Sequence, residues 1–148
     1  MPQTFTKYCL FLREDLAALK DDFFDKEDLH GMKADTYMYK ELRNFLRAKG
    51  IDLNTQHINK PEESEVIICL NETKYFQTYE RNKTNRLILL ILTEPPVYNF
   101  VDWSEERHAY FDKVLSYDSD LITKNPLKYK QINYPIDLGT SSQNTIPS

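Results

Sequence analysis

Short apolar runs recur along the chain and alternate with more polar stretches. Residues 8–12, 51–55, 65–70, 86–93, 113–117 and 129–134 combine apolar character with strand-forming side chains, and each run predicts a β-strand. The run 86–93 contains six consecutive aliphatic residues, which is typical of a parallel strand covered on both faces. We therefore expect residues 86–93 to form the central strand of a parallel sheet.

Helical periodicity appears between several of these runs, most clearly before residue 50. Asp35 or Thr36 can cap a helix there, and Gly50 can end it. The residues expected to recur along one face of this helix are Met38, Leu42, Phe45 and Leu46. Residues 73–83 indicate a weaker helix, 104–111 a short one and 119–123 a single turn. The acidic stretch up to residue 33 indicates a long irregular connection.

Strands that alternate with helices at this spacing predict an α/β fold with a doubly wound, Rossmann-like parallel sheet. A chain of 148 residues that is 41% hydrophobic fits one globular domain, which we place at residues 1–135. Residues 136–148 are polar, and we expect them to form a disordered tail.

Charge and glycine content exclude two classes of function. The formal net charge of −4 arises from interspersed acids and bases, so the chain lacks the basic stripe that nucleic-acid binding requires. It has three glycines, and none belongs to a glycine-rich loop of the kind that cradles a phosphate. We expect no nucleic-acid partner and no nucleotide loop within this chain.

The cysteines and the length of the apolar runs bear on the cellular compartment. Cys9 and Cys69 each lie inside a predicted strand, where a reduced thiol behaves as a small core residue. The N-terminus lacks the layout of a signal peptide, and the run Leu87–Leu92 is far too short to span a membrane. These features predict a cytoplasmic protein with no transmembrane segment, and leave peripheral attachment to the inner membrane open.

The end of the predicted central strand carries the candidate chemistry. Ligands of open parallel sheets bind at the carboxyl ends of the strands, and Glu94 follows the strand there, directly before Pro95. A carboxylate in apolar surroundings suits a general base, although the same residue can equally be a solvated loop residue. The aromatic residues Tyr98, Phe100 and Trp103 can stack on a sugar ring or can anchor this loop to the core.

A metal site is not predicted. Asp118 and Asp120 match the Asp-x-Asp pattern of metal-dependent glycosyltransferases, but Asp118 as the N-cap of a short helix explains the same residues. His30, His57 and His108 are spaced too irregularly to form a metal site. We therefore expect no metal cofactor.

Two segments resemble a known family. Residues 89–97, with the sequence LLILTEPPV, and residues 108–121, with the sequence HAYFDKVLSYDSDL, are similar to the N-terminal domain of glycosyltransferase family 10, the α-1,3-fucosyltransferases. Residues 46–55 and 65–70 agree with that domain in their order. The resemblance covers approximately residues 37 to 135.

The resemblance implies one half of a two-domain, GT-B-type inverting glycosyltransferase of glycan biosynthesis or protein glycosylation. In such enzymes the N-terminal half binds the glycan acceptor, and the C-terminal half binds the donor, GDP-fucose. The proposed general base falls on Glu94, and the acceptor-binding aromatics on Tyr98, Phe100 and Trp103. Because the donor-binding half is missing from this chain, we expect it to be inactive alone and to need a separately encoded partner. The alternative function is a non-catalytic α/β module that binds a glycan or a protein.

Overall fold

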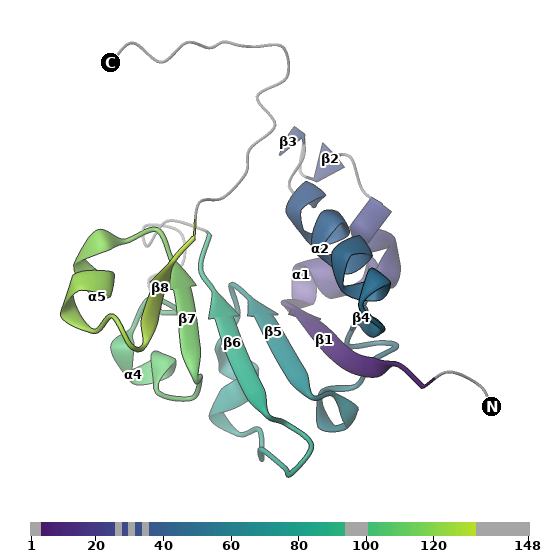
Figure 1. The fold of residues 1–148 in the computed structure, drawn as a ribbon. Helices are drawn as coiled ribbons and strands as arrows, with labels where there is room; N and C mark the ends of the chain where they lie inside the picture. The colour runs from purple at the N-terminus through teal and green to yellow at the C-terminus, as the bar shows by residue number, and fades with distance from the viewer. Residues whose placement is uncertain (1–3, 26–27, 30–31, 34–35, 94–100, 133–148) are drawn as a thin grey trace.

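A six-stranded, fully parallel sheet forms the centre of the protein (Figure 1). The structure is a computed structural model that describes residues 4–25, 28–29, 32–33, 36–93 and 101–132. In spatial order the strands are β4 (Ile51–Thr55), β1 (Thr6–Leu12), β5 (Val66–Leu70), β6 (Leu87–Ile91), β7 (Lys113–Ser116) and β8 (Tyr129–Gln131). The predicted Rossmann-like α/β class is therefore confirmed. The run of aliphatic residues lies inside the sheet, between β5 and β7.

The helices between the strands are mostly short. They are α1 (Glu14–Ala17), α2 (Tyr37–Ala48), α4 (Glu105–His108) and α5 (Ser119–Lys124), together with the 3-10 helices η1 (Lys20–Asp25), η2 (Pro61–Glu63) and η3 (Lys74–Gln77). A two-stranded hairpin of β2 (Asp28–Leu29) and β3 (Met32–Lys33) precedes α2. None of the helices in the described ranges has the length and apolar character needed to cross a membrane.

Two of the helix predictions need correction. The stretch before residue 33, predicted to be irregular, contains α1, η1 and a hairpin. Residues 73–83 were predicted to form a helix, but only the single 3-10 helix η3 forms there. Its aromatic residues hold it against the sheet, with the rings of Phe76 and Phe11 5.3 Å apart, so tertiary packing rather than helical propensity sets its shape.

Helix α2 has the predicted position but a different buried face. Gly50 follows it with a φ of 79°, a left-handed conformation that glycine adopts without strain. Tyr39 and Leu46 are its buried residues, whereas Phe45, predicted to share the apolar face, is 57% exposed. The ammonium group of Lys49 lies 5.0 Å from the Phe45 ring centroid, so this ring has a cationic partner at the surface.

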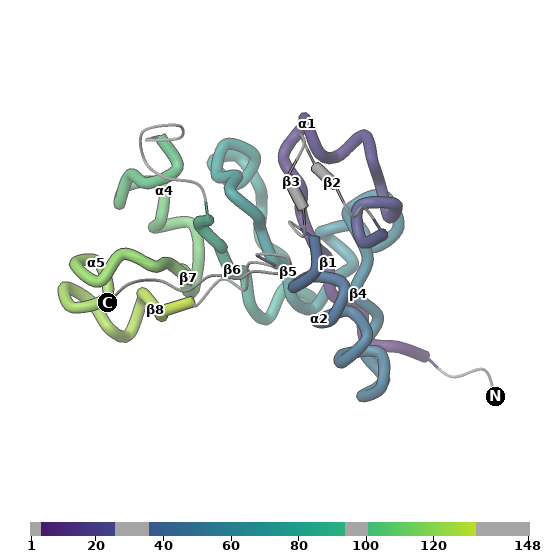
Figure 2. The backbone as a smooth tube through the Cα atoms, turned by 90° about the horizontal axis from the view of Figure 1, so that it is seen from above, coloured from purple at the N-terminus to yellow at the C-terminus, as the bar shows by residue number. Residues whose placement is uncertain are grey.

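The direction of the chain across the sheet reverses once, next to β1. From β1 the chain runs to β4 on one side, and then returns past β1 to β5, β6, β7 and β8 on the other side. Because crossovers between parallel strands are right-handed, this reversal sends the β1–β4 connection to one face and the later connections to the opposite face. Figure 2 shows α2 and α4 on opposite sides of the sheet.

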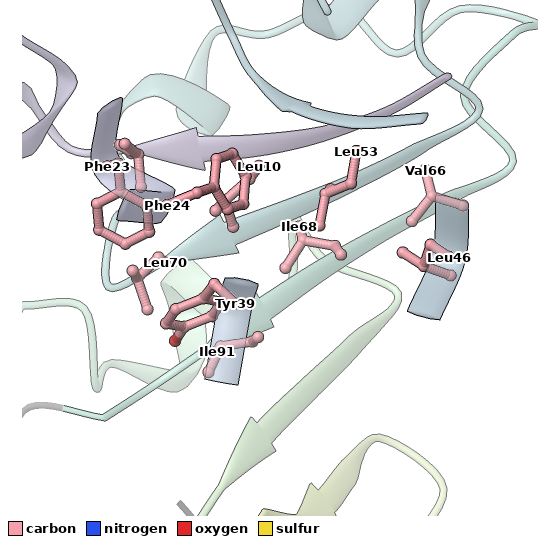
Figure 3. Close-up of a cluster of buried hydrophobic side chains, with 11 residues drawn as sticks. Leu10, Phe23, Phe24, Tyr39, Leu46, Leu53, Val66, Ile68, Leu70 and Ile91 are labelled. Carbon is pink, nitrogen blue, oxygen red and sulfur yellow. The ribbon is translucent and has the colours of Figure 1, made fainter. Parts of the chain in front are cut away.

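Each face of the sheet has its own hydrophobic core. On the first face, α1, η1 and α2 cover residues of β1, β4 and β5, and Figure 3 shows Tyr39 beside Leu70 and Ile91 in this cluster. The second core holds Cys9, Phe11, Ile67, Cys69, Phe76, Ile88, Leu90, Leu92, Phe111, Val114 and Tyr129. Strand β6 contributes to both cores, as predicted, although Leu87 and Leu89 stay half-buried on the first face. Because the chain reverses direction at β1, the helices of the first face lie mainly over β4, β1 and β5 and cover β6 less completely.

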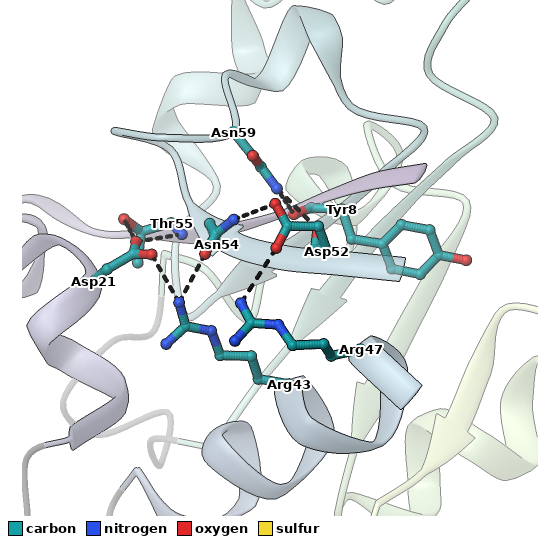
Figure 4. A network of polar contacts seen from close by, with 8 residues as sticks. All are labelled: Tyr8, Asp21, Arg43, Arg47, Asp52, Asn54, Thr55 and Asn59. Carbon is teal, nitrogen blue, oxygen red and sulfur yellow. Dashed lines mark hydrogen bonds and ion pairs between the residues drawn. The ribbon is translucent and has the colours of Figure 1, made fainter. Parts of the chain in front are cut away.

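Strand β4 is an edge of the sheet, and a polar network covers it (Figure 4). Asp21 accepts hydrogen bonds from the backbone N–H of Thr55 at 2.9 Å and from its hydroxyl at 2.6 Å. Arg43 pairs with Asp21 at 3.2 Å and donates to Asn54 at 2.8 Å. Its guanidinium carbon also lies 4.3 Å from the ring centroid of Phe24. The network satisfies polar groups that an open strand edge otherwise exposes.

Replacement of Asp21 by alanine tests this network. The substitution leaves the Thr55 donors without their acceptor and removes the carboxylate partner of the half-buried Arg43, so we expect the free energy of unfolding to fall by about 2–3 kcal/mol. Urea denaturation followed by circular dichroism measures the change. The neighbouring, exposed Asp22 is the control, and Asp22→Ala should change stability by no more than about 0.5 kcal/mol. Equal effects of the two substitutions would contradict the role assigned to Asp21.

Candidate functional site

The carboxyl ends of β1 and β5 form the topological switch point of the sheet. The chain leaves these two neighbouring strands in opposite directions, and open α/β sheets bind their ligands in the crevice at such a point. Polar side chains gather beside it, after β5 and at the end of β6. We call Asn71, Glu72, Thr73, Thr93, Asp102 and Arg107 the carboxyl-edge cluster.

Asn71 fastens the end of β6 to the end of β5. It has a φ of 49°, a left-handed conformation that asparagine adopts more readily than most residues. Its side-chain amide donates to the Thr93 hydroxyl at 2.6 Å, and its side-chain oxygen accepts from the Thr93 backbone N–H at 2.8 Å. Its own backbone N–H donates to the carbonyl of Ile91 at 2.9 Å. Two hydrogen bonds thus fix Thr93 at the carboxyl edge, and the third holds Asn71 to the last residue of β6.

Thr73 fastens a second segment to the same place. Its buried hydroxyl donates to a carboxylate oxygen of Asp102, and it accepts a hydrogen bond from Arg107 at 3.1 Å. Asp102 is itself buried, and its backbone carbonyl accepts from Nε2 of His108 at 2.7 Å. The segment that leads into α4 is therefore held against the residues that follow β5.

These contacts anchor both flanks of the stretch 94–100. Thr93 precedes the stretch and is bound to Asn71, whereas Asp102 lies shortly after it and is bound to Thr73. Both anchors belong to the three residues that follow β5. The predicted base Glu94 and the predicted acceptor-binding residues Tyr98 and Phe100 lie outside the described residues. Their assigned roles stay predictions.

Glu72 adds a carboxylate between the two anchors. It is half-buried, and its Oε1 accepts a hydrogen bond from the backbone N–H of Lys74 at 2.8 Å. Burial raises the pKa of this carboxyl, and the nearby charge of Asp102 adds to the rise. A carboxyl with a raised pKa at a ligand-binding edge is suited to proton transfer.

The sequence analysis did not single out the carboxyl-edge cluster. The rule applied to Glu94, that ligands bind at the carboxyl ends of parallel strands, applies equally to the residues that follow the predicted strand 65–70. It therefore points to Asn71 and Glu72 as well. Asp102 and Arg107 carry no such signal, because they reach the cluster through the path of the chain after β6.

Trp103 is the one predicted acceptor-binding residue within the described ranges. It is half-buried and packs against the second core, as expected of a residue that anchors the loop, and its role in acceptor binding stays a prediction. Its ring also contacts the ring of Tyr117, with the centroids 5.5 Å apart and the planes at 68°. Tyr117 follows β7 and is 44% exposed. Trp103 therefore lies between the core and an aromatic side chain at the carboxyl edge.

Asp118 caps α5, as the second interpretation of the Asp-x-Asp pattern predicts. Its Oδ1 accepts from the backbone N–H of Asp120 at 2.9 Å. Across the described part of the chain, no group of three or more histidine, cysteine, aspartate or glutamate residues is arranged to hold a metal ion.

The cysteines are buried free thiols, as predicted. Cys9 lies on β1 and Cys69 on β5, both in the second core. Burial raises the pKa of both thiols. A thiol with a raised pKa is a poor nucleophile, so neither cysteine is suited to covalent catalysis.

His108 joins α4 to β8 beneath the cluster. Because Nε2 donates to the carbonyl of Asp102, the neutral ring accepts at Nδ1 from the Tyr129 hydroxyl, at 2.8 Å. The residue is 1% exposed, and burial lowers its pKa. The folded protein therefore favours the uncharged imidazole.

His108 predicts a pH dependence of stability. Above about pH 6.5 its imidazole is neutral in both the folded and the unfolded chain. Below that pH the unfolded chain binds a proton that the folded chain resists, so the free energy of unfolding falls, by at most about 1.4 kcal/mol per pH unit. Urea denaturation between about pH 7.5 and pH 5.5 measures the slope. His108→Gln should flatten it, whereas the control His57→Gln, at an exposed position, should leave it unchanged.

The result that contradicts this assignment is a slope that persists in His108→Gln. The decrease would then arise from other groups that titrate in the same range.

Comparison with known proteins identifies no relative. No protein-family model, no curated protein and no solved structure matches this chain.

Proposed function

We propose that this chain is the acceptor-side half of an inverting fucosyltransferase that transfers fucose from GDP-fucose to a glycan acceptor. The chain supplies the surface that binds the acceptor and the carboxylate that deprotonates its attacking hydroxyl. A donor-binding half that lies outside this sequence binds GDP-fucose. The proposal combines the resemblance of residues 37–135 to the family 10 domain with the Rossmann-like sheet.

The observation that carries the proposal is the anchoring of both flanks of the stretch 94–100. Asn71 and Thr73 bind Thr93 and Asp102, and all four lie by the switch point of the sheet. In the proposed enzyme this stretch supplies Glu94, the general base. The hydrogen bonds of Thr93 and Asp102 hold the residues on either side of the stretch in place. Positioning of this kind is a large part of catalysis.

Glu94 is assigned the role of general base. It accepts the proton of the acceptor hydroxyl as that oxygen attacks the anomeric carbon of fucose and GDP leaves. Glu72 is assigned a supporting role, because its half-buried carboxyl lies at the same edge and its raised pKa suits it to exchange a proton there.

The donor site is assigned to the partner half. The three glycines of this chain, Gly31, Gly50 and Gly139, form no phosphate-binding loop, and the formal net charge is −4. A diphosphate requires several hydrogen-bond donors and positive charges, which the partner half must supply.

The isolated chain should therefore bind GDP-fucose weakly or not at all. Isothermal titration calorimetry with GDP-fucose measures the affinity directly, and we expect a dissociation constant above about 1 mM. Mn²⁺ should not improve binding, because the described residues contain no group of three or more histidine, cysteine, aspartate or glutamate side chains arranged to hold a metal ion. Micromolar binding of GDP-fucose by this chain alone would refute the two-half arrangement.

The proposal is tested by a fucosyl-transfer assay with a complete enzyme. The chain is combined with the donor-binding half of a bacterial α-1,3-fucosyltransferase, and transfer from GDP-fucose to a panel of oligosaccharides is measured. We expect transfer only when both halves are present. Glu94→Gln should slow the chemical step by on the order of 10²-fold or more, because it removes the proton acceptor and preserves the shape of the side chain.

Two further variants serve as controls in this assay. Glu72→Gln should slow transfer by less than about tenfold, since its role is a supporting one. Glu106→Gln, at an exposed position in the first turn of α4, should leave the rate unchanged. If Glu72→Gln abolishes transfer while Glu94→Gln has no effect, the base is Glu72. If binding of the two halves is demonstrated and no acceptor is fucosylated, the chain is not a transferase half.

A further inference from the structure

Tyr117 and Trp103 form an aromatic corner at the carboxyl edge of the sheet. Their ring centroids are 5.5 Å apart, and the ring planes meet at 68°. In such an edge-to-face contact, the edge of one ring meets the face of the other, so the pair buries only part of its aromatic surface. Tyr117 retains 44% of its surface exposed, although its ring contacts Trp103, which packs against the second core.

The sheet register places this corner level with the end of β6. Ile91 of β6 pairs with Leu115 of β7, and two residues further along each chain are Thr93 and Tyr117. Neighbouring strands lie about 4.8 Å apart. Tyr117, which follows β7, therefore lies beside Thr93, which the carboxyl-edge cluster holds in place. The corner thus lies at the same carboxyl edge of the sheet as the cluster, on the far side of β6 from β5.

A carboxylate lies next to Tyr117 in the sequence. Asp118 follows Tyr117 directly and is half-exposed. Its Oδ1 caps α5, and among the hydrogen bonds of the described residues its Oδ2 has no partner. Apolar ring surface beside a carboxylate oxygen is the combination that recognises a sugar, because pyranose rings present C–H groups on their faces and hydroxyl donors at their edges.

We propose that Trp103 and Tyr117 form a carbohydrate-binding subsite, in which a pyranose ring packs against the aromatic corner and donates a hydroxyl hydrogen bond to Asp118. This inference rests on the proposed function only in naming the bound sugar as part of the transferase acceptor. The binding itself depends on the geometry of the corner.

The single tryptophan of the chain makes the subsite directly observable. Trp103 is the only tryptophan, so all tryptophan fluorescence arises from this corner. The protein is titrated with methyl β-galactopyranoside and with lactose, and glycerol serves as an acyclic polyol at the same concentrations. We expect a saturable fluorescence change with the two sugars, with a dissociation constant on the order of 1 mM, and none with glycerol.

Three variants define which residues bind. Tyr117→Ala should weaken sugar binding by about threefold to tenfold, whereas Tyr117→Phe, which keeps the ring, should retain it. Asp118→Asn, which keeps an oxygen that can cap the helix, should weaken binding by about twofold to tenfold. Tyr110→Ala is the matched control, because Tyr110 is 41% exposed but lies between α4 and β7, toward the amino ends of the strands. It should bind as the unsubstituted protein does.

The inference is overturned if neither sugar changes the fluorescence, if glycerol produces the same change, or if Tyr117→Ala and Tyr110→Ala bind the sugars equally well. Its failure is distinguishable from that of the proposed function. Saturable sugar binding without fucosyl transfer by the combined halves contradicts the transferase and supports the subsite. Transfer with an acceptor KM that Tyr117→Ala does not change contradicts the subsite and supports the transferase.

Discussion

The reversal of chain direction beside β1 is the constraint on which the rest of this structure depends. Parallel strands need crossover connections, and right-handed crossovers that run in opposite directions along the sheet must lie on opposite faces. The connection from β1 to β4 therefore covers one face, and η3, α4 and α5 cover the other. Because of the same reversal, the chain leaves the carboxyl ends of β1 and β5 in opposite directions. Polar groups gather beside this point.

The polar contacts at that edge are built mainly from one short stretch. Asn71 and Thr73, two residues apart after β5, bind the end of β6 and the start of the segment that leads into α4. Arg107 and His108 add contacts from α4 itself. Because several of these groups are buried, the loss of any partner leaves an unsatisfied donor or acceptor, and the arrangement behaves as a unit.

Strand β4, the outermost strand on one side of the sheet, has polar groups that pair within the fold. Asp21 and Arg43 come from η1 and α2 and satisfy the polar groups of the outermost strand. At the carboxyl edge, by contrast, Tyr117 and Glu72 retain exposed surface. Asp21 and Arg43 thus satisfy polar groups of the fold itself, whereas Tyr117 and Glu72 present groups to solvent at the carboxyl edge.

The sequence by itself determined the class of the fold, the positions of the strands, α2 with its terminating Gly50, and the cap at Asp118. These features follow from local periodicity, from aliphatic runs and from cap chemistry, all of which act between near neighbours. Tertiary structure alone decided that Phe45 faces solvent, that residues 73–83 contain only the short 3-10 helix η3, and that Asp102 reaches Thr73. The strand order also had to come from the structure, since periodicity does not reveal which strands pair. Most of the carboxyl-edge cluster joins residues about 20 to 35 positions apart, and only the reversal at β1 and the handedness of the crossovers bring them together.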